Sequence, residues 1–242
     1  MSLRTALSLI LASACAVVPA TLHAQTAPAP KPAKTFQLLS SADFPEDGLV
    51  PAPAPRGSQA EKLELDYLHA LIAGTSPARL EQARQDDGHE DPSIFDQVMG
   101  VDLKTLPATW ELLTLVHNEA NMAANIYKEH FARVRPWGVD PTMPNCDAGK
   151  DKKPTRSYPS GHSVLGYSVG LVLATLAPAK AAAVLDRARD YALSREICGV
   201  HFPTDTEASH VIASIAAERI LADPRAAQRI AAARAELARL AR

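Results

Sequence analysis

The segment from Ser163 to Ala179 carries no charged side chain and is almost entirely apolar. A run of this kind has to be removed from water, either in a membrane or inside a protein. It has 17 residues and is interrupted by Gly166, Gly170 and Pro178, so it is short for a membrane span. We therefore expect a helix that is buried on all sides and surrounded by other helices.

The flanking segments show helical spacing. Leu65, Leu68 and Ile72 follow an i, i+3, i+7 pattern that Gly74 ends. Aromatic residues are 5% of the chain and alternating β-branched runs are absent, so strands are not expected. The sequence predicts an all-α, single-domain helical bundle over residues 58–242. Further helices are expected from Ser76-Pro77 onward, at 92–99, 107–134, 181–197 and 204–221, and from Asp223 to Arg242.

The first 24 residues are typical of a secretory signal peptide. Arg4 gives a charged start, Ala6 to Val18 is apolar or small, and small residues near Ala24 suit a signal peptidase. We expect cleavage after Ala24 and export to the periplasm. A lipid anchor on Cys15 is the less favoured alternative, because Ala12 stands where lipoprotein sites prefer Leu.

Residues 25–57 are rich in proline and contain few periodic apolar positions. They are expected to form an extended N-terminal arm, with Phe36 to Leu39 and Phe44 packed onto the domain.

The charge balance limits the class of partner. The chain has 25 basic and 27 acidic side chains, a net charge of −2, and loss of Arg4 with the leader would make it −3. A mildly acidic chain lacks the basic surface that nucleic-acid binding requires. No integral membrane segment is expected after signal removal, and monomer and homo-oligomer both stay open.

The cysteines agree with export. Once Cys15 is removed with the leader, Cys146 and Cys198 remain. Two thiols in an oxidising compartment are expected to form one disulfide. The alternatives are two unpaired buried cysteines or metal ligands, but no CxxC or HxxxH spacing supports a metal site.

A first polar motif is formed by Lys128 and, seven residues later, Arg135. On one helix they would share a face, and Pro136 is expected to end that helix at Arg135. The guanidinium would then point beyond the helix end. The alternative is that both cations, together with Arg133, are solvated charges on an amphipathic face.

A second motif, Pro159-Ser160-Gly161-His162, stands immediately before the uncharged run. Ser160 is suited to cap a helix, and Gly161 lets a ligand approach the backbone. Free N–H groups at a helix start bind anions, typically phosphate, so His162 would stand beside a bound anion. The alternative is an ordinary capped helix start with an incidental surface histidine.

In the third motif, Ser194-Arg195 is followed by His201 and, four residues later, by Asp205. A carboxylate placed there can accept a hydrogen bond from one imidazole nitrogen. The lone pair of the other nitrogen is then available for attack. The alternative is a loop histidine followed by an acidic side chain in the first turn of a helix.

Taken together, the motifs supply what phosphoryl transfer needs: charge stabilisation and in-line placement of nucleophile and leaving group. His201 would attack phosphorus and His162 would protonate the departing alcohol, since histidines in different environments can differ in protonation at one pH. Neither a metal nor another cofactor is expected, because three cations would already neutralise the phosphoryl charge. The expected phosphate-binding residues are Lys128, Arg135, Ser160, Gly161 and Arg195.

These motifs resemble the signature of the type 2 phosphatidic acid phosphatase superfamily, which includes the vanadate-dependent haloperoxidases. Within it, the chain resembles the class A bacterial nonspecific acid phosphatases over roughly residues 48–240, including the Pro-rich lead-in before Gly57-Ser58. The matching stretches are Lys128-Glu129-His130, Arg135-Pro136, Tyr158 to His162, and Ser194 to Gly199.

The resemblance implies a soluble periplasmic α-helical enzyme that hydrolyses small phosphomonoesters through a phosphohistidine. It implies that His201 is the nucleophile, Asp205 its partner and His162 the acid. Pairing of Cys146 with Cys198 also fits the class.

Two segments depart from the class A pattern. His117-Asn118-Glu119 stands where an acidic pair is typical, and Phe202-Pro203-Thr204 is similar to other branches. The alternatives are hydrolysis of lipid or polyprenyl phosphates, vanadate-dependent halide oxidation, and anion binding without catalysis. Substrate preference is expected to depend on residues 113–120 and on the loop 137–158.

Overall fold

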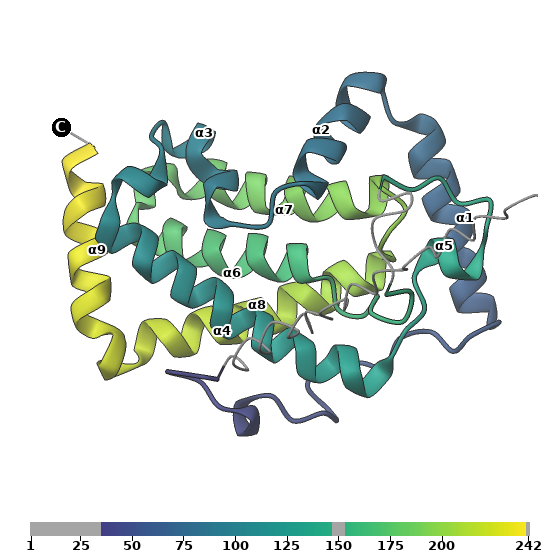
Figure 1. Ribbon diagram of the computed structural model, residues 1–242, viewed down its shortest axis with the longest axis horizontal. Coiled ribbons are helices and arrows are strands. Elements are labelled where there is room, and N and C mark those ends of the chain that lie inside the picture. Colours follow the sequence, from purple (N-terminus) through teal and green to yellow (C-terminus); the bar gives the residue numbers. More distant parts are fainter. Residues whose placement is uncertain (1–34, 147–152, 241–242) are drawn as a thin grey trace, which may run out of the picture. The chain divides into compact units, whose positions relative to one another are not determined.

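The computed structural model describes residues 35–146 and 153–240, and this part of the chain contains helices and no strand (Figure 1). The expected all-α class is confirmed. Residues 1–34 lie outside the described residues. They include the expected leader with its cleavage site after Ala24, the alternative lipid site at Cys15 and the start of the arm. The α-helices are α1 Gln59–Gly74, α2 Pro77–Asp87, α3 Asp96–Met99, α4 Pro107–Phe131, α5 Pro136–Val139, α6 Gly161–Leu176, α7 Ala181–Ile197, α8 Pro203–Ala222 and α9 Ala227–Leu240.

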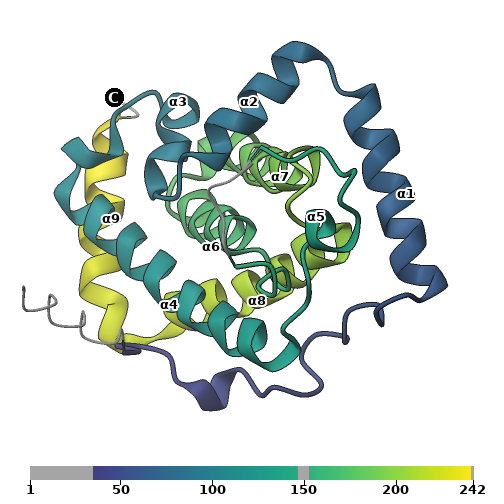
Figure 2. The same cartoon turned by 45° about the vertical axis from the view of Figure 1, so that its right-hand side comes forward.

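The uncharged run forms α6, which lies in the middle of the bundle and packs against α4, α7 and α8 (Figure 2). Close packing against α7 depends on small residues. A Cβ added at Gly166 would lie 2.9 Å from Cδ1 of Tyr191, and one added at Gly170 would lie 3.0 Å from Cβ of Ala188. Within the described residues, no helix is both long and apolar enough to cross a membrane.

The end of α4 differs from the expectation. Ala132 adopts a left-handed conformation with φ +44°, which ends the helix at Phe131. Pro136 then occupies the first turn of α5, with Arg135 as its N-cap. The prediction that Lys128 and Arg135 share one helix was therefore wrong, because the chain turns before it reaches Arg135.

The described part of the N-terminal arm packs onto the helices, with Leu38, Leu39 and Phe44 buried in the main core. The carboxylate of Glu119 holds it there by accepting backbone N–H groups. Oε1 accepts from Gln37 at 2.8 Å, and Oε2 accepts from Leu38 at 3.1 Å and from Leu39 at 2.8 Å. Glu119 thus anchors the arm.

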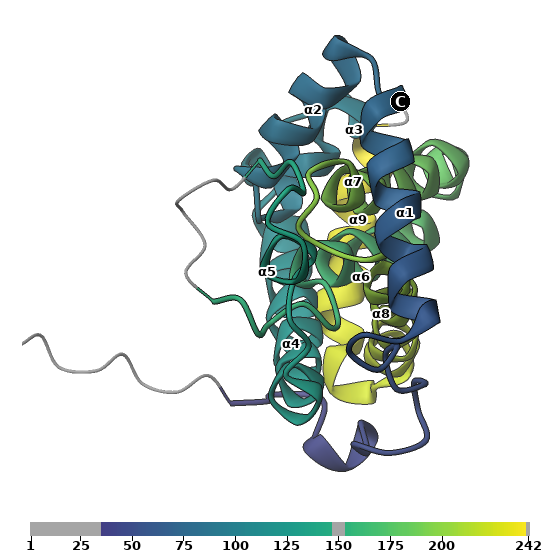
Figure 3. The same cartoon turned by 90° about the vertical axis from the view of Figure 1, so that its right-hand side faces the viewer.

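Four helix ends meet at one end of the bundle. The C-termini of α4 and α7 and the N-termini of α6 and α8 lie together on the right in Figure 1 and face the viewer in Figure 3. A Cys146–Cys198 disulfide, with Cα atoms 4.9 Å apart, fastens the loop after α5 to the end of α7. Gly199 has φ +64°, and a Cβ there would collide with the carbonyl oxygen of Pro144.

Candidate active site

A polar pocket of about 380 Å³ opens where these helix ends meet. A larger cavity of about 660 Å³, lined by residues of α2 and by Arg187, contains none of the motif residues. The polar pocket brings both histidines and all three expected cations together. Its lining residues are Asp87, Glu90, Asn121, Asn125, Lys128, Arg135, Lys153, Arg156, Gly161, His162, Arg195 and His201.

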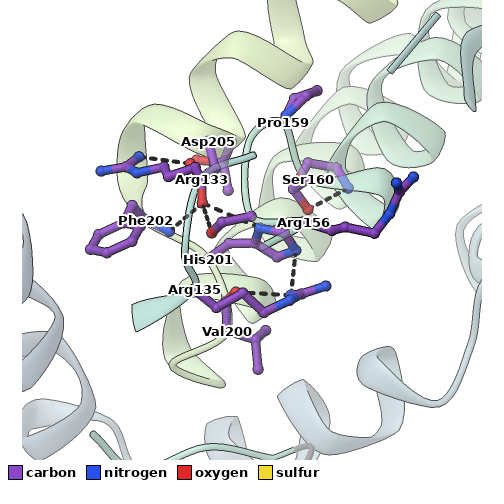
Figure 4. A network of polar contacts seen from close by, with 12 residues as sticks. Arg133, Arg135, Arg156, Pro159, Ser160, Val200, His201, Phe202 and Asp205 are labelled. Atoms are coloured by element: carbon purple, nitrogen blue, oxygen red, sulfur yellow. Dashed lines mark hydrogen bonds and ion pairs between the residues drawn. The ribbon is translucent and has the colours of Figure 1, made fainter. Parts of the chain in front are cut away.

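His201 is held by contacts at both ring nitrogens (Figure 4). Nδ1 lies 3.3 Å from Oδ2 of Asp205, and Nε2 lies 3.0 Å from Nη1 of Arg135. Because a guanidinium can only donate, Nε2 must be the acceptor, which leaves the ring proton on Nδ1 beside Asp205. The lone pair of Nε2 therefore points into the cationic pocket.

Burial and charge keep this imidazole neutral. His201 is 1% exposed, and burial lowers its pKa well below the usual value, with Arg135 and Lys128 lowering it further. A neutral ring retains the lone pair that a nucleophile needs.

Asp205 is saturated with hydrogen-bond donors and does not line the pocket. Its Oδ2 accepts from Ser157 Oγ at 2.5 Å and from the N–H of Phe202 at 2.9 Å. Its Oδ1 accepts from Nη1 of Arg133 at 2.7 Å. A carboxylate fixed in this way holds its position relative to the His201 ring.

The structure contradicts the alternative in which Lys128, Arg135 and Arg133 are solvated charges on an amphipathic face, because all three side chains are buried. Arg133 is 6% exposed, and its guanidinium carbon lies 3.8 Å from the ring centroid of Phe202. Its second nitrogen pairs with Glu64 at 2.5 Å. No spacing in the sequence connects Glu64 on α1 with Arg133, so sequence reasoning missed this support.

His162 stands in the first turn of α6 with 14% of its side chain exposed. Its Nε2 lies 3.2 Å from the carbonyl oxygen of Asp87, which can only accept, so Nε2 carries the proton. Nδ1 lies 3.7 Å from Glu90. Burial, followed by Arg195 and His201, lowers the pKa of His162 well below its usual value.

Arg195 is 2% exposed and forms an ion pair with the carboxylate of Asp87 at the end of α2. The preceding residue fixes the same helix end, since Ser194 Oγ donates to Asp86 at 2.5 Å. Asp87 therefore contacts Arg195 with its side chain and His162 with its backbone. Because 108 residues separate Asp87 from Arg195, no local pattern pointed to it.

Lys128 is 7% exposed, and its ammonium donates to the carbonyl oxygens of Arg156, at 3.0 Å, and Pro159. It thus ties α4 to the segment that leads into α6. Burial, with Arg135 as the next cause, lowers the pKa of Lys128 to about 7. A bound anion would oppose both effects and favour the charged form.

Ser160 and Gly161 play different parts in the structure. Ser160 is fully buried, caps α6 by accepting from Ser163 N–H at 3.3 Å, and donates its own N–H to Ser209 Oγ at 2.9 Å. Gly161 lines the pocket. The Ser160 N–H is thus directed toward α8, and Gly161 is the residue of this pair that lines the pocket.

The pocket wall beyond the motifs comes from α4 and from the segment before α6. Asn121 and Asn125 line it, while Leu113, Leu115 and Val116 of the segment expected to set preference are buried in the core. From the loop 137–158, which is also expected to set substrate preference, Lys153 and Arg156 line the pocket. Among the residues that the structure describes, no group of three or more His, Cys, Asp or Glu side chains is placed to hold a metal ion.

Comparison with known proteins points to one family. The sequence profile of the PAP2 superfamily matches residues 109–227. A non-specific acid phosphatase of Providencia stuartii is 29% identical over 153 residues, which is 61% of each chain. An acid phosphatase of Zymomonas mobilis subsp. mobilis is 36% identical over 48% of this chain and 44% of its own length.

A non-specific acid phosphatase of Salmonella typhimurium is 28% identical over 216 residues, covering 85% of this chain and 86% of its own. The similarity to the Providencia and Zymomonas proteins spans less than two thirds of their length. The profile match includes all three polar motifs, from Lys128 to Asp205.

Proposed function

Because the chain belongs to the PAP2 superfamily, we propose that it is a metal-independent acid phosphatase that hydrolyses phosphomonoesters through a phosphohistidine. The observation that carries the proposal is the state of His201. Its Nε2 accepts from Arg135 at 3.0 Å while Nδ1 faces Asp205 at 3.3 Å, so a buried lone pair is presented to a cationic pocket. The named relatives are acid phosphatases, which supports the same reaction.

In the first step, the Nε2 lone pair of His201 attacks phosphorus and the bond to the leaving oxygen breaks. The entering phosphoryl group takes the place of Nε2 as the acceptor for Arg135. Lys128 and Arg195 hold other non-bridging oxygens, where charge accumulates in the transition state. His162 gives its proton to the departing alkoxide, which leaves as the alcohol.

In the second step, the now neutral His162 takes a proton from a water molecule, whose oxygen attacks phosphorus. The phosphorus–nitrogen bond breaks, orthophosphate leaves and His201 regains its lone pair. The cations balance charge throughout, so the mechanism requires no metal.

Acidic conditions favour this cycle. Burial and Arg195 lower the pKa of His162, so its protonated form requires acidic solution or a bound phosphate dianion. His201 must stay neutral in the same complex, and Arg135 and Lys128 favour that state.

We further propose that residues 1–24 direct export to the periplasm and are removed, that residues 25–57 form the arm, and that residues 58–242 form the catalytic domain. The Cys146–Cys198 disulfide supports an oxidising compartment. Small phosphomonoesters are the proposed substrates, and polymeric nucleic acid is not a proposed partner.

The test is hydrolysis of p-nitrophenyl phosphate by the mature protein with and without a chelator. We expect equal rates, and loss of turnover in His201→Ala with an unchanged circular dichroism spectrum. Loss of activity on chelation would contradict the metal-independent mechanism. Bromide oxidation with vanadate and peroxide, without phosphate ester hydrolysis, would favour the haloperoxidase alternative.

A further inference from the structure

We propose that Arg156 forms a second anion subsite beside the phosphoryl-binding cations and selects diphosphates, in which the leaving group is itself a phosphoryl group. The inference rests on the proposed phosphatase function and specifies its substrate class. It concerns a residue outside the three motifs.

Arg156 is fixed next to the reaction centre by two bonds to α4. Its carbonyl oxygen accepts from Lys128 Nζ at 3.0 Å, and its Nη2 donates to Oδ1 of Asn125 at 2.5 Å. Its side chain is 29% exposed and lines the same pocket as the histidines. In Figure 4, the side chain of Arg156 lies on the opposite side of His201 from Arg133 and Phe202.

The charges of the pocket exceed what one phosphoryl group needs. Five cationic side chains and two carboxylates line the pocket, an excess of three positive charges against the two negative charges of a monoester, and Lys153 and Arg156 supply two of the cations from one short segment. The acidic lining residues, Asp87 and Glu90, belong to α2 and the turn after it. A second anionic group on the ligand would therefore be attracted to the 153–156 wall.

Lys128 and Arg156 are in direct contact, which favours a diphosphate over a ligand whose two anionic groups lie far apart. Both residues line the same pocket, and Lys128 Nζ donates to the backbone carbonyl oxygen of Arg156 at 3.0 Å. A phosphoryl group directly bonded to the one held by Lys128 would then bind the Arg156 guanidinium, a basic group at this wall of the pocket. The fork of N–H donors on an arginine matches the oxygens of such a group.

A purely structural role for Arg156 is the competing explanation. Asn125 occupies one guanidinium nitrogen, and Nη1 lies 3.9 Å from Glu129, a long contact to a side chain that is 75% exposed. These contacts orient the side chain without enclosing it. A purely structural role would change kcat/KM for all substrates by the same factor, so the two roles can be separated by experiment.

The experiment compares kcat/KM for inorganic pyrophosphate with kcat/KM for p-nitrophenyl phosphate. Arg156→Gln is expected to lower the pyrophosphate to p-nitrophenyl phosphate ratio about tenfold or more, as loss of a charge-assisted hydrogen bond would. Arg156→Lys should restore part of it. Arg189→Gln is the matched control, since Arg189 has 74% of its side chain exposed and does not line the pocket. An unchanged ratio in Arg156→Gln overturns the proposal.

Binding separates this inference from the proposed function. In His201→Ala, calorimetric titration should show tighter binding of pyrophosphate than of orthophosphate, and added Arg156→Gln should remove the difference. Equal binding of both anions overturns the subsite even if p-nitrophenyl phosphate is hydrolysed. If no phosphate ester is hydrolysed but pyrophosphate binds through Arg156, the proposed function fails and the subsite stands.

Discussion

Arg133 donates to Asp205 across 72 residues of sequence, with its Nη1 2.7 Å from Oδ1 of the carboxylate. The same guanidinium pairs with Glu64 on α1 and stacks on Phe202, the residue after the candidate nucleophile His201. One buried arginine therefore holds the carboxylate that contacts His201 and links it to the first helix.

Replacing Arg133 with Gln should damage both stability and turnover. Breaking a buried ion pair costs about 3–5 kcal/mol, and misplacement of a catalytic group by about 1 Å can lower activity about 100-fold. Guanidinium denaturation and kcat measure the two effects. Arg133→Lys should not rescue, because one ammonium cannot reproduce the planar fork to Asp205 and Glu64. A folded Arg133→Gln protein with unchanged kcat would contradict the positioning role.

Stability should fall as solution becomes acidic when no anion is bound. The pKa values of His162 and His201 are lowered, so below about pH 6.5 the unfolded state binds protons that the folded state does not. The loss is at most about 1.4 kcal/mol per pH unit for each histidine. It begins as pH falls through the unfolded pKa and ends below the folded one.

The effect can be isolated with melting temperatures between pH 7 and 5 in the wild type and His162→Gln. The variant should lose less stability on acidification than the wild type. Inorganic phosphate should reverse part of the wild-type loss, because a bound phosphate anion favours protonated His162. A variant that loses as much stability as the wild type would contradict the lowered pKa.

The sequence predicted the helices well where one signal dominated. The uncharged run predicted α6, and the helix expected at 204–221 is α8, Pro203–Ala222. The C-terminus of α4 was missed because Ala132 is not a residue expected in the left-handed region, and no glycine marks the turn. Extending the helix to Val134 therefore placed Arg135 on the wrong element.

The site could be predicted only in part, for a related reason. The residues within each motif lie close together in the sequence and have recognisable chemistry. The pocket brings the three motifs together. The supporting residues Arg133, Asp87 and Arg156 act through partners on other helices. Glu64 is 69 residues from Arg133, so only the folded structure could identify the pair.

Replacing Gly199 with Ala should disrupt the turn between α7 and His201. A Cβ there would collide with the Pro144 carbonyl, and φ +64° is unfavourable for alanine. We expect a loss of several kcal/mol, about 3 or more, and reduced activity. Gly74→Ala is the control, since its Cβ would meet nothing within 4 Å and alanine is favoured in a helix. Equal unfolding free energies for the two variants would contradict this account.

Removing the disulfide should destabilise the folded protein. Cys146 and Cys198 are 52 residues apart, and closing a loop of that size contributes about 4 kcal/mol in the chain-entropy model. Cys146→Ser and reduction of the wild type should lower the denaturation midpoint by the same amount. A midpoint unaffected by reduction would show that the bond does not form in solution.

Formation of a covalent bond between phosphorus and His201 is the central step of the proposed reaction. Rapid mixing with substrate, an alkaline quench and peptide mass spectrometry should find one phosphoryl group on the peptide that contains His201, and more of it in His162→Gln when the leaving group needs no proton. Absence of the adduct during turnover, or its appearance on another residue, would contradict the account.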